Sequence, residues 1–199
     1  TDVSVEGVHF RREWLTLEEI GWRAAATALS DLAAAGASAI GVVAAVTVPA
    51  GEEAATTTRL MQGVDAAVAS VGGTILGGDL SRGGVISLAV TVLGSAERRM
   101  TRAGARPGDG LWVTGTLGGA GAALAAWTAG RDPAPAARAR FAHPEPRLEW
   151  GRWLAGHRAT AMLDVSDGLG GDAGHLAAAS GVGLTIELER LPLHRSVDA

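Results

Sequence analysis

The chain has 199 residues, of which 17 are basic and 21 acidic, and its formal net charge is −4. This balance is typical of an ordinary globular protein of one large or two small domains, not of a disordered or polycationic chain. Every basic residue is Arg, and Lys, Asn, Cys and Tyr are absent. Walker-type phosphate loops, Schiff bases, thiol nucleophiles, disulfides and cysteine-ligated metals are therefore excluded. Any phosphate or metal must be handled by carboxylates, Arg, hydroxyls and backbone amides.

The first half of the chain alternates between strand and helix patterns. Acidic residues in a first turn and Gly36 after the last apolar position bound a long helix. Gly72 and Gly73 end a second helix, and residues 81–84 form a turn between two strands. The predicted elements are a strand at 3–10, a helix at 17–35, a buried strand at 40–48, a helix at 60–72, and strands at 74–79 and 85–93. This order predicts an α/β (α+β) domain over residues 1–95.

A long uncharged stretch lies between Asp31 and Glu52. It is long enough to raise the question of a membrane span. However, Gly36, Gly41 and Pro49 interrupt it, and its second half is typical of a buried strand. We therefore expect no membrane contact and, without an export signal, a cytoplasmic protein.

A second, incomplete domain is predicted over residues 110–199. Apolar periodicity disappears over residues 96–109, where Arg side chains gather beside Pro107 and Gly108, which indicates a hinge. These arginines form either a solvated hinge or a phosphate clamp, and the acidic total argues against nucleic acid. Beyond the hinge we expect strands at 111–114, 161–165 and 182–188, helices at 118–129, 147–154 and 169–179, and a Pro/Ala-rich connection at 131–146.

Residues 164–169, Asp-Val-Ser-Asp-Gly-Leu, stand where a buried strand gives way to a helix. Proteins of the α/β class usually bind ligands at this edge of a sheet. Ser166 is expected to cap the helix, and Asp167 to lie in its first turn beside unpaired amides that attract phosphate. The neighbouring carboxylates of Asp164 and Asp167 favour a Mg²⁺ site. An N-cap serine flanked by acids that complement the helix dipole explains the pattern equally well.

Other candidate residues are weaker when each is taken alone. Gly78 and Asp79 follow a short strand, where they form either a phosphate contact and metal ligand or a simple turn. Asp31 lies within an Ala/Leu helix, either buried with an Arg or ligating metal. His9 is either a core histidine or a ligand. Asp172 and His175 have the spacing of a helical pair that needs no ligand.

The order of these motifs closely resembles the thiamine-monophosphate kinase family, within the superfamily of aminoimidazole ribonucleotide synthetase. The resemblance rests on Thr1-Asp2, Glu6-Gly7-Val8-His9-Phe10, the segments at 30–37 and 101–109, Gly77-Gly78-Asp79, and Asp164-Val165-Ser166-Asp167-Gly168-Leu169. It implies a two-domain fold, ATP-dependent phosphorylation of thiamine monophosphate by direct in-line transfer, and several Mg²⁺ ions. It also implies a homodimer formed through the sheet of the first domain.

The resemblance assigns roles to residues at the matching positions. It implies that Thr1, Asp2, Asp31, Asp79, Asp164 and Asp167 are metal ligands, that Gly78, Asp79, Arg102 and Ser166 contact the nucleotide, and that His9 contacts the substrate. It assigns no catalytic base. The family also has segments before Thr1 and after Ala199, so we expect the 199 residues alone to bind nucleotide weakly and to turn over poorly. The alternatives are another ATP-using synthetase of the superfamily and a non-catalytic nucleotide-binding or dimerisation module.

Overall fold

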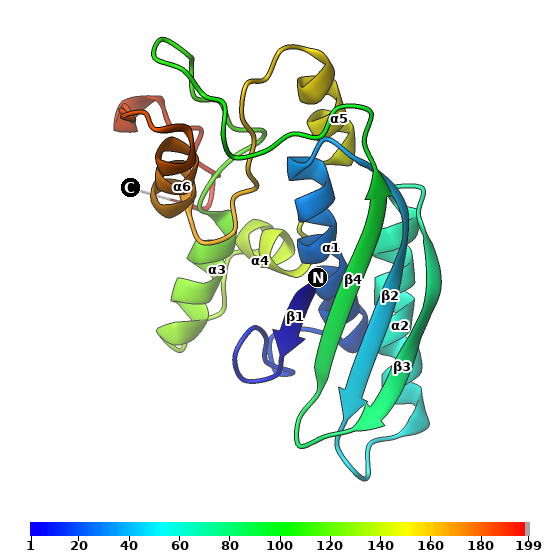
Figure 1. The fold of residues 1–199 in the computed structure, drawn as a ribbon. Helices are drawn as coiled ribbons and strands as arrows, with labels where there is room; N and C mark the ends of the chain where they lie inside the picture. Colours follow the sequence, from blue (N-terminus) through cyan, green and yellow to red (C-terminus); the bar gives the residue numbers. More distant parts are fainter. Residues whose placement is uncertain (198–199) are drawn as a thin grey trace.

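The computed structural model describes residues 1–197. Its centre is a four-stranded sheet in the order β1-β4-β2-β3, and two helices cover one face while the other face stays open (Figure 1). β3 runs parallel to β2, whereas β4 is antiparallel to both β1 and β2. The strands are β1 (Asp2–Val5), β2 (Ser38–Val48), β3 (Thr74–Arg82) and β4 (Ser87–Ser95), and the helices are α1 (Leu17–Ala34) and α2 (Ala54–Ala69). The predicted α/β fold class is confirmed.

The ends of α1 follow from local chemistry. Thr16 Oγ1 accepts a hydrogen bond from the Glu19 amide at 3.2 Å, and the Thr16 amide donates to Glu19 Oε2 at 2.9 Å. This capping box satisfies two of the amides that a helix start leaves unpaired. After the last turn, Gly36 adopts a φ of +69°, which glycine accepts without strain. The predicted helix is therefore confirmed to within one residue.

Two glycines let α1 and α2 cross at close range. A Cβ at Gly21 would lie 1.9 Å from the Leu60 carbonyl oxygen, and one at Gly63 would lie 1.9 Å from that of Glu18. The close crossing seals a core between the helices and the sheet, with Ile20, Leu29, Leu60, Val64, Val42 and Val90 among its fully buried side chains. This core holds α1 rigidly against β1 and β4.

The second half of the chain is helical where it is regular. It comprises α3 (Gly119–Thr128), α4 (Pro135–Ala142), α5 (Leu148–Gly156), α6 (Leu169–Ser180) and the short 3₁₀ helix η1 (Leu188–Arg190). The three predicted helices are confirmed, but the expected connection at 131–146 contains α4. The strands expected at 111–114, 161–165 and 182–188 do not form within residues 1–197. Their backbones meet only isolated partners, such as the Thr101 carbonyl for the Met162 amide, and no continuous ladder builds up.

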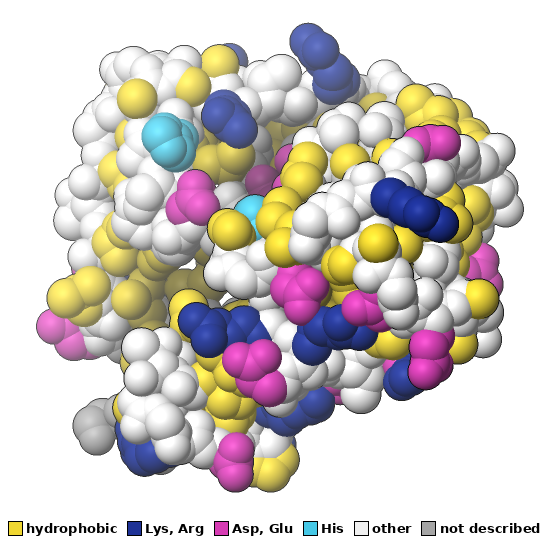
Figure 2. All heavy atoms as spheres, turned by 90° about the horizontal axis from the view of Figure 1, so that it is seen from below, with side chains coloured by type: hydrophobic (Ala, Val, Ile, Leu, Met, Phe, Trp, Pro, Cys, Tyr) yellow, Lys and Arg dark blue, Asp and Glu magenta, His cyan; other side chains and the backbone are white. Residues whose placement is uncertain are grey.

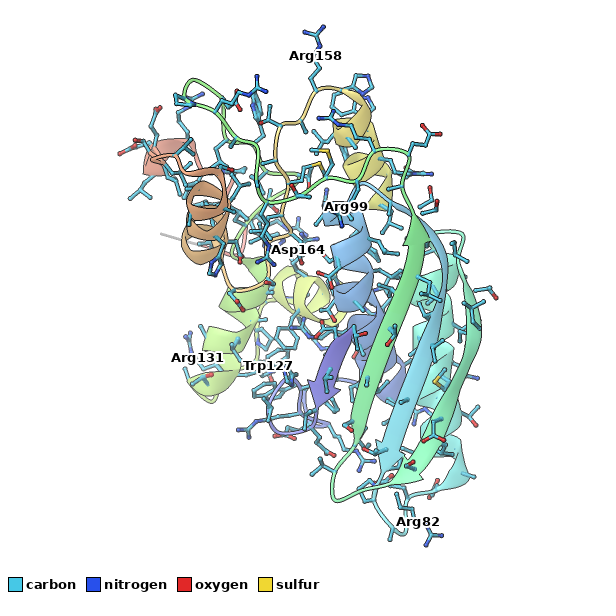
Figure 3. All side chains as sticks on the ribbon, viewed as in Figure 1. Arg82, Arg99, Trp127, Arg131, Arg158 and Asp164 are labelled. Carbon is cyan, nitrogen blue, oxygen red and sulfur yellow. The ribbon has the colours of Figure 1, made fainter. Side chains whose placement is uncertain are left out.

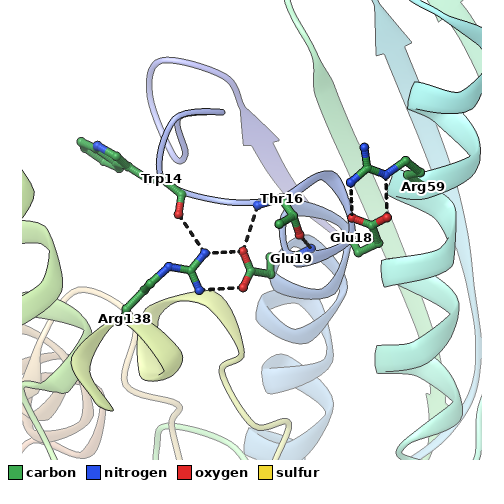
Figure 4. A network of polar contacts seen from close by, with 6 residues as sticks. All are labelled: Trp14, Thr16, Glu18, Glu19, Arg59 and Arg138. Carbon is green, nitrogen blue, oxygen red and sulfur yellow. Dashed lines mark hydrogen bonds and ion pairs between the residues drawn. The ribbon is translucent and has the colours of Figure 1, made fainter. Parts of the chain in front are cut away.

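The two halves meet in an aromatic and ionic contact. Trp14 stacks on Trp127 of α3 with ring centroids 4.9 Å apart, and the Arg23 guanidinium lies 4.0 Å from the centre of the Phe141 ring of α4. Arg138 of α4 donates to both carboxylate oxygens of Glu19, at 2.8 and 2.7 Å (Figure 4). Figure 2 shows the molecule from below, and on this face acidic and basic side chains lie beside one another. These contacts fix α3 and α4 on the N-terminal end of α1.

Within residues 1–197, no helix combines the length and apolar character that crossing a membrane needs.

Candidate functional site

Two hollows of similar size open on the surface. One, of about 410 Å³, is lined partly by Arg12, Arg59 and Arg138. Each of these arginines already pairs with a glutamate, at 2.6 to 2.7 Å. The other, of about 450 Å³, lies where the C-terminal part of α1 meets residues 100–103, residues 162–164 and α6. We take this second hollow, called the candidate cavity below, as the candidate site, because three residues named in the sequence analysis line it.

Asp31, Arg102 and Asp164 come from three distant segments and line this one cavity. Asp31 is exposed near the end of α1, so the interpretation that it is buried with an Arg is wrong. The Met100 amide donates to the Ala35 carbonyl oxygen at 3.0 Å, and the Met162 amide donates to that of Thr101 at 2.9 Å. These two backbone bonds place the Arg102 and Asp164 segments beside the end of α1. Figure 3 shows Asp164 in the space between α1 and α6.

Ionisation of the Asp164 carboxyl is unfavourable in the folded protein. Burial raises its pKa above the ordinary value, the charges of Asp31 and Asp172 add to the rise, and a hydrogen bond with Ser30 opposes it. Neighbouring carboxylates that disfavour one another's charge are stabilised when a cation lies between them. Mg²⁺ in proteins is held by one or two carboxylates, with water and substrate phosphates completing its shell. Asp31 and Asp164 fit such an ion.

The start of α6 differs from the prediction. The helix begins at Leu169 after Gly168, and no side chain caps it, so Ser166 is not its cap and Asp167 lies before its first turn. The amides of residues 166, 167 and 168 all donate to Asp172 Oδ2, at 2.9, 3.1 and 3.1 Å. They are therefore not free to attract phosphate. Asp172 reaches back to this loop, and its predicted pairing with His175 is wrong.

The N-terminal candidates lie on or near β1. Thr1 Oγ1 is 2.9 Å from Thr91 Oγ1 of β4, and Asp2 Oδ1 accepts from the Val3 amide at 2.7 Å. His9 is exposed, and its Nδ1 accepts from the Val5 amide at 3.1 Å. The interpretation of His9 as a core histidine is therefore wrong, and its Nε2 is left for other contacts.

Gly78 and Asp79 lie on β3, at the opposite edge of the sheet from β1. Asp79 is in register with Ala45 of β2, which is in register with Ala89 of β4, and Asp79 Oδ2 accepts from the Ser81 hydroxyl at 2.8 Å. Three strand spacings of roughly 4.8 Å separate β3 from β1. A Cβ at Gly78 would lie 2.0 Å from the Ala44 carbonyl oxygen, so this glycine is needed for strand packing.

Within residues 1–197, no three acidic or histidine side chains come together in a way that could hold a metal ion. The structure thus brings together Asp31, Arg102 and Asp164 but not the whole predicted ligand set. The sequence interpretation missed the hydrogen bonds between Asp172 and the amides of residues 166–168. Their signal was an acid four residues after Gly168, inside the first turn of the helix.

Comparisons with known proteins show the family to which the chain belongs. The model for the N-terminal domain of AIR synthase related proteins matches residues 1–96, and the model for the C-terminal domain matches residues 106–198. The thiamine-monophosphate kinase of Halobacterium salinarum is 40% identical over 173 residues, which are 87% of this chain and 58% of that protein. The thiamine monophosphate kinase structure from Aquifex aeolicus has a TM-score of 0.91 at 34% identity, and the match covers 98% of this chain and 68% of that one. The chain belongs to the thiamine-monophosphate kinase family.

Other members of the thiamine-monophosphate kinase family support this placement. The thiamine-monophosphate kinase of Synechococcus elongatus is 37% identical over an alignment of 210 positions, which covers 100% of this chain and 64% of that protein. The structure of AaThiL complexed with AMPPCP and TMP has a TM-score of 0.92 at 34% identity, covering 98% of this chain and 64% of that one. The hydrogenase maturation protein HypE of E. coli, at 20% identity and a TM-score of 0.78, shares the fold. The chain spans 58% and 64% of the length of the two curated relatives named.

Proposed function

We propose that the protein transfers a phosphoryl group from ATP to thiamine monophosphate, forming thiamine diphosphate by direct in-line transfer. The observation that carries the proposal is the cavity that brings Asp31, Arg102 and Asp164 together in a chain of this family. Phosphoryl transfer needs mainly positioning and neutralisation of developing negative charge. A cavity with two carboxylates for a metal and one guanidinium supplies groups of this kind without any lysine.

We propose Mg²⁺ as the metal, and Asp31 and Asp164 as the residues that hold it. When bound, the ion neutralises charge on the transferred phosphate. Thr1, Asp2, Asp79 and Asp167 complete the proposed set of metal ligands. Gly78, Asp79, Arg102 and Ser166 are the proposed nucleotide contacts and His9 the proposed substrate contact. Arg102, which lines the cavity, would bind phosphate oxygens through its fixed guanidinium donors.

We propose that the protein is a homodimer that pairs through the open face of the sheet. The strand registers place Val3, Val43 and Leu93 on this face, and all three are exposed. An exposed apolar sheet face is typical of a protein–protein contact. Asp79 lies on the same face, at the edge far from Asp2. We propose that a second copy on this face brings its own Asp79 to the site, which one chain leaves incomplete.

The proposal extends to the organisation of the chain and to its location. Residues 1–95 form the nucleotide, metal and dimerisation domain, residues 96–109 the hinge, and residues 110–199 part of the second domain. Arg98 of the hinge donates to the carbonyl oxygens of Ala155 and Ala159, which ties the hinge to the end of α5. We also propose that the protein works in the cytoplasm, where ATP is available.

An ADP-release assay on the protein at its full natural length, with a panel of phosphorylated acceptors, tests the proposal. We expect turnover with thiamine monophosphate alone, dependent on Mg²⁺. Turnover with a different phosphorylated acceptor would favour another synthetase of the superfamily. Nucleotide binding without turnover on any acceptor would favour a non-catalytic module and would overturn the proposed function.

A further inference from the structure

Asp172 is a buried carboxylate, and its exposed fraction is only 5%. It lies in the first turn of α6, where its Oδ2 accepts hydrogen bonds from the amides of Ser166, Asp167 and Gly168 at 2.9, 3.1 and 3.1 Å. No ion pair in the described part of the chain involves this carboxylate. The three converging amides are therefore what offsets the cost of burying its charge.

These hydrogen bonds determine the path of the loop. Gly168, which precedes the helix, has a φ of +114° that only glycine adopts readily. The N-cap position is Gly168, which has no side chain to cap the helix. Asp172, in the first turn, provides part of the capping instead, because its carboxylate accepts a hydrogen bond from the Gly168 amide. The loop connects Asp164, which lines the candidate cavity, to α6, which contributes Ala179 to the same cavity. Holding the loop therefore holds one wall of the site.

We propose that Asp172 is a positioning residue, whose carboxylate holds the loop of residues 166–168 in the shape that the metal–nucleotide complex requires without itself binding the metal. This inference rests on the proposed function. It also assigns the loop amides to Asp172 and not to phosphate. The phosphates must then be held by the metal and by other groups of the site, Arg102 among them.

Amide hydrogen exchange tests the first half of this proposal without any ligand. In D172A the three amides lose their shared acceptor, and we expect exchange at residues 166–168 to become about tenfold faster or more. D172N keeps an acceptor oxygen but loses the charge, so its exchange should be intermediate. Added formate should slow the exchange again in D172A, because it can occupy the vacated carboxylate position. Unchanged exchange in D172A would show that Asp172 does not hold the loop.

Titration of Mg²⁺ by calorimetry, in the presence of AMPPCP, tests the second half on the same full-length variants. We expect the apparent affinity for Mg²⁺ to fall about tenfold in D172A and less in D172N, because outer groups that orient ligands typically have effects of this size. The KM for thiamine monophosphate should change little. Faster exchange with unchanged Mg²⁺ affinity in both variants would make Asp172 merely structural and would overturn the proposal.

The matched control is D65N, which removes the same charge from an exposed position on α2. It should leave both readouts at the wild-type level, and the circular dichroism spectra of all variants establish that they are folded. If D172A does not fold, D172N still decides between the outcomes. Absence of turnover in the wild-type protein would count against the proposed function alone, since neither amide exchange nor the Mg²⁺ titration depends on turnover.

Discussion

Asp164 is a proposed metal ligand whose charged form lowers the stability of the fold. Its pKa is raised, chiefly by burial, so the folded state binds its proton more tightly than the unfolded chain does. Stability is therefore lost as the pH rises through the interval above 3.8, the ordinary value, because the carboxyl must ionise inside the structure. At neutral pH the charged form is useful only if a cation accompanies it.

We expect D164N to separate these two effects. The neutral amide should raise the stability of the metal-free protein at pH 7 by up to about 1 kcal/mol, after allowance for solvent screening. It should also lower Mg²⁺-dependent turnover by about 100-fold or more. Thermal unfolding and the ADP-release assay measure the two quantities, and D132N, at an exposed loop position, is the control. Lower stability together with full activity would contradict the assignment of Asp164 to the metal.

At the scale of elements, helix crossing and helix capping determine where the site can form. The close approach of α1 and α2 depends on Gly21 and Gly63, because neither position leaves room for a Cβ. The start of α1 carries Glu19, which serves both its own capping box and Arg138 of α4. α1 thus holds its sheet on one side and the second half of the chain on the other.

We expect G63A to destabilise the fold by about 1 to 3 kcal/mol, because the added methyl group would collide with the Glu18 carbonyl oxygen. The matched control is G121A in α3, where nothing lies within 4 Å of an added Cβ. That substitution should stabilise the helix by about 0.5 to 1 kcal/mol. Urea unfolding measures both, and equal effects of the two variants would rule out the close crossing.

The link between Glu19 and Arg138 should depend on pH. Burial alone would raise the pKa of Glu19, but hydrogen bonds from Arg138 and the Thr16 amide, with the charge of Arg138, outweigh it and lower the pKa below 4.5. The stabilisation is therefore present above pH 4.5 and is lost as the pH falls through the lower folded-state value. We expect E19Q to cost about 1 kcal/mol at pH 7 and progressively less in acid. Thermal unfolding at several pH values checks this, and a cost that does not vary with pH would contradict it.

At the scale of the whole molecule, the sheet has one face covered by α1 and α2 and one face without helices (Figure 1). The open face carries apolar side chains together with Asp79. In the proposed dimer, this combination would link assembly to the completeness of the site, because Asp79 lies at the edge of the sheet far from β1 of the same chain.

We expect V43E to convert the proposed dimer into a monomer and to lower turnover by about tenfold or more, because a charge on an apolar interface must be desolvated. Val43 is 38% exposed on the open face, so the substitution should leave the monomer folded. Sedimentation velocity and the ADP-release assay report the two effects. L188E, at a residue that is 71% exposed on η1, is the control. A dimeric V43E protein would argue against the open face as the interface.

Local sequence patterns correctly predicted those helices and strands whose determining residues lie close together in the chain. The acids of the first turn and Gly36 predicted α1 to within one residue, and the apolar run at 40–48 predicted most of β2. Asp31, Arg102 and Asp164 were singled out by their motifs, and they line one cavity. The strands of the second half were not correctly predicted, because a strand forms only when another backbone completes its hydrogen bonds.

What the sequence determined by itself is therefore the chemistry: acids, Arg and backbone amides in place of Lys and Cys, together with the helix limits set by neighbouring residues. The tertiary structure alone decided which of these groups meet. Asp79 follows its glycines in the motif as expected, yet the strand order places it at the far edge of the sheet from β1. Asp172 has the spacing to pair with His175, but its carboxylate instead accepts hydrogen bonds from three loop amides. Both outcomes depend on how segments pack against one another in the folded chain. Residue type and spacing do not determine that packing.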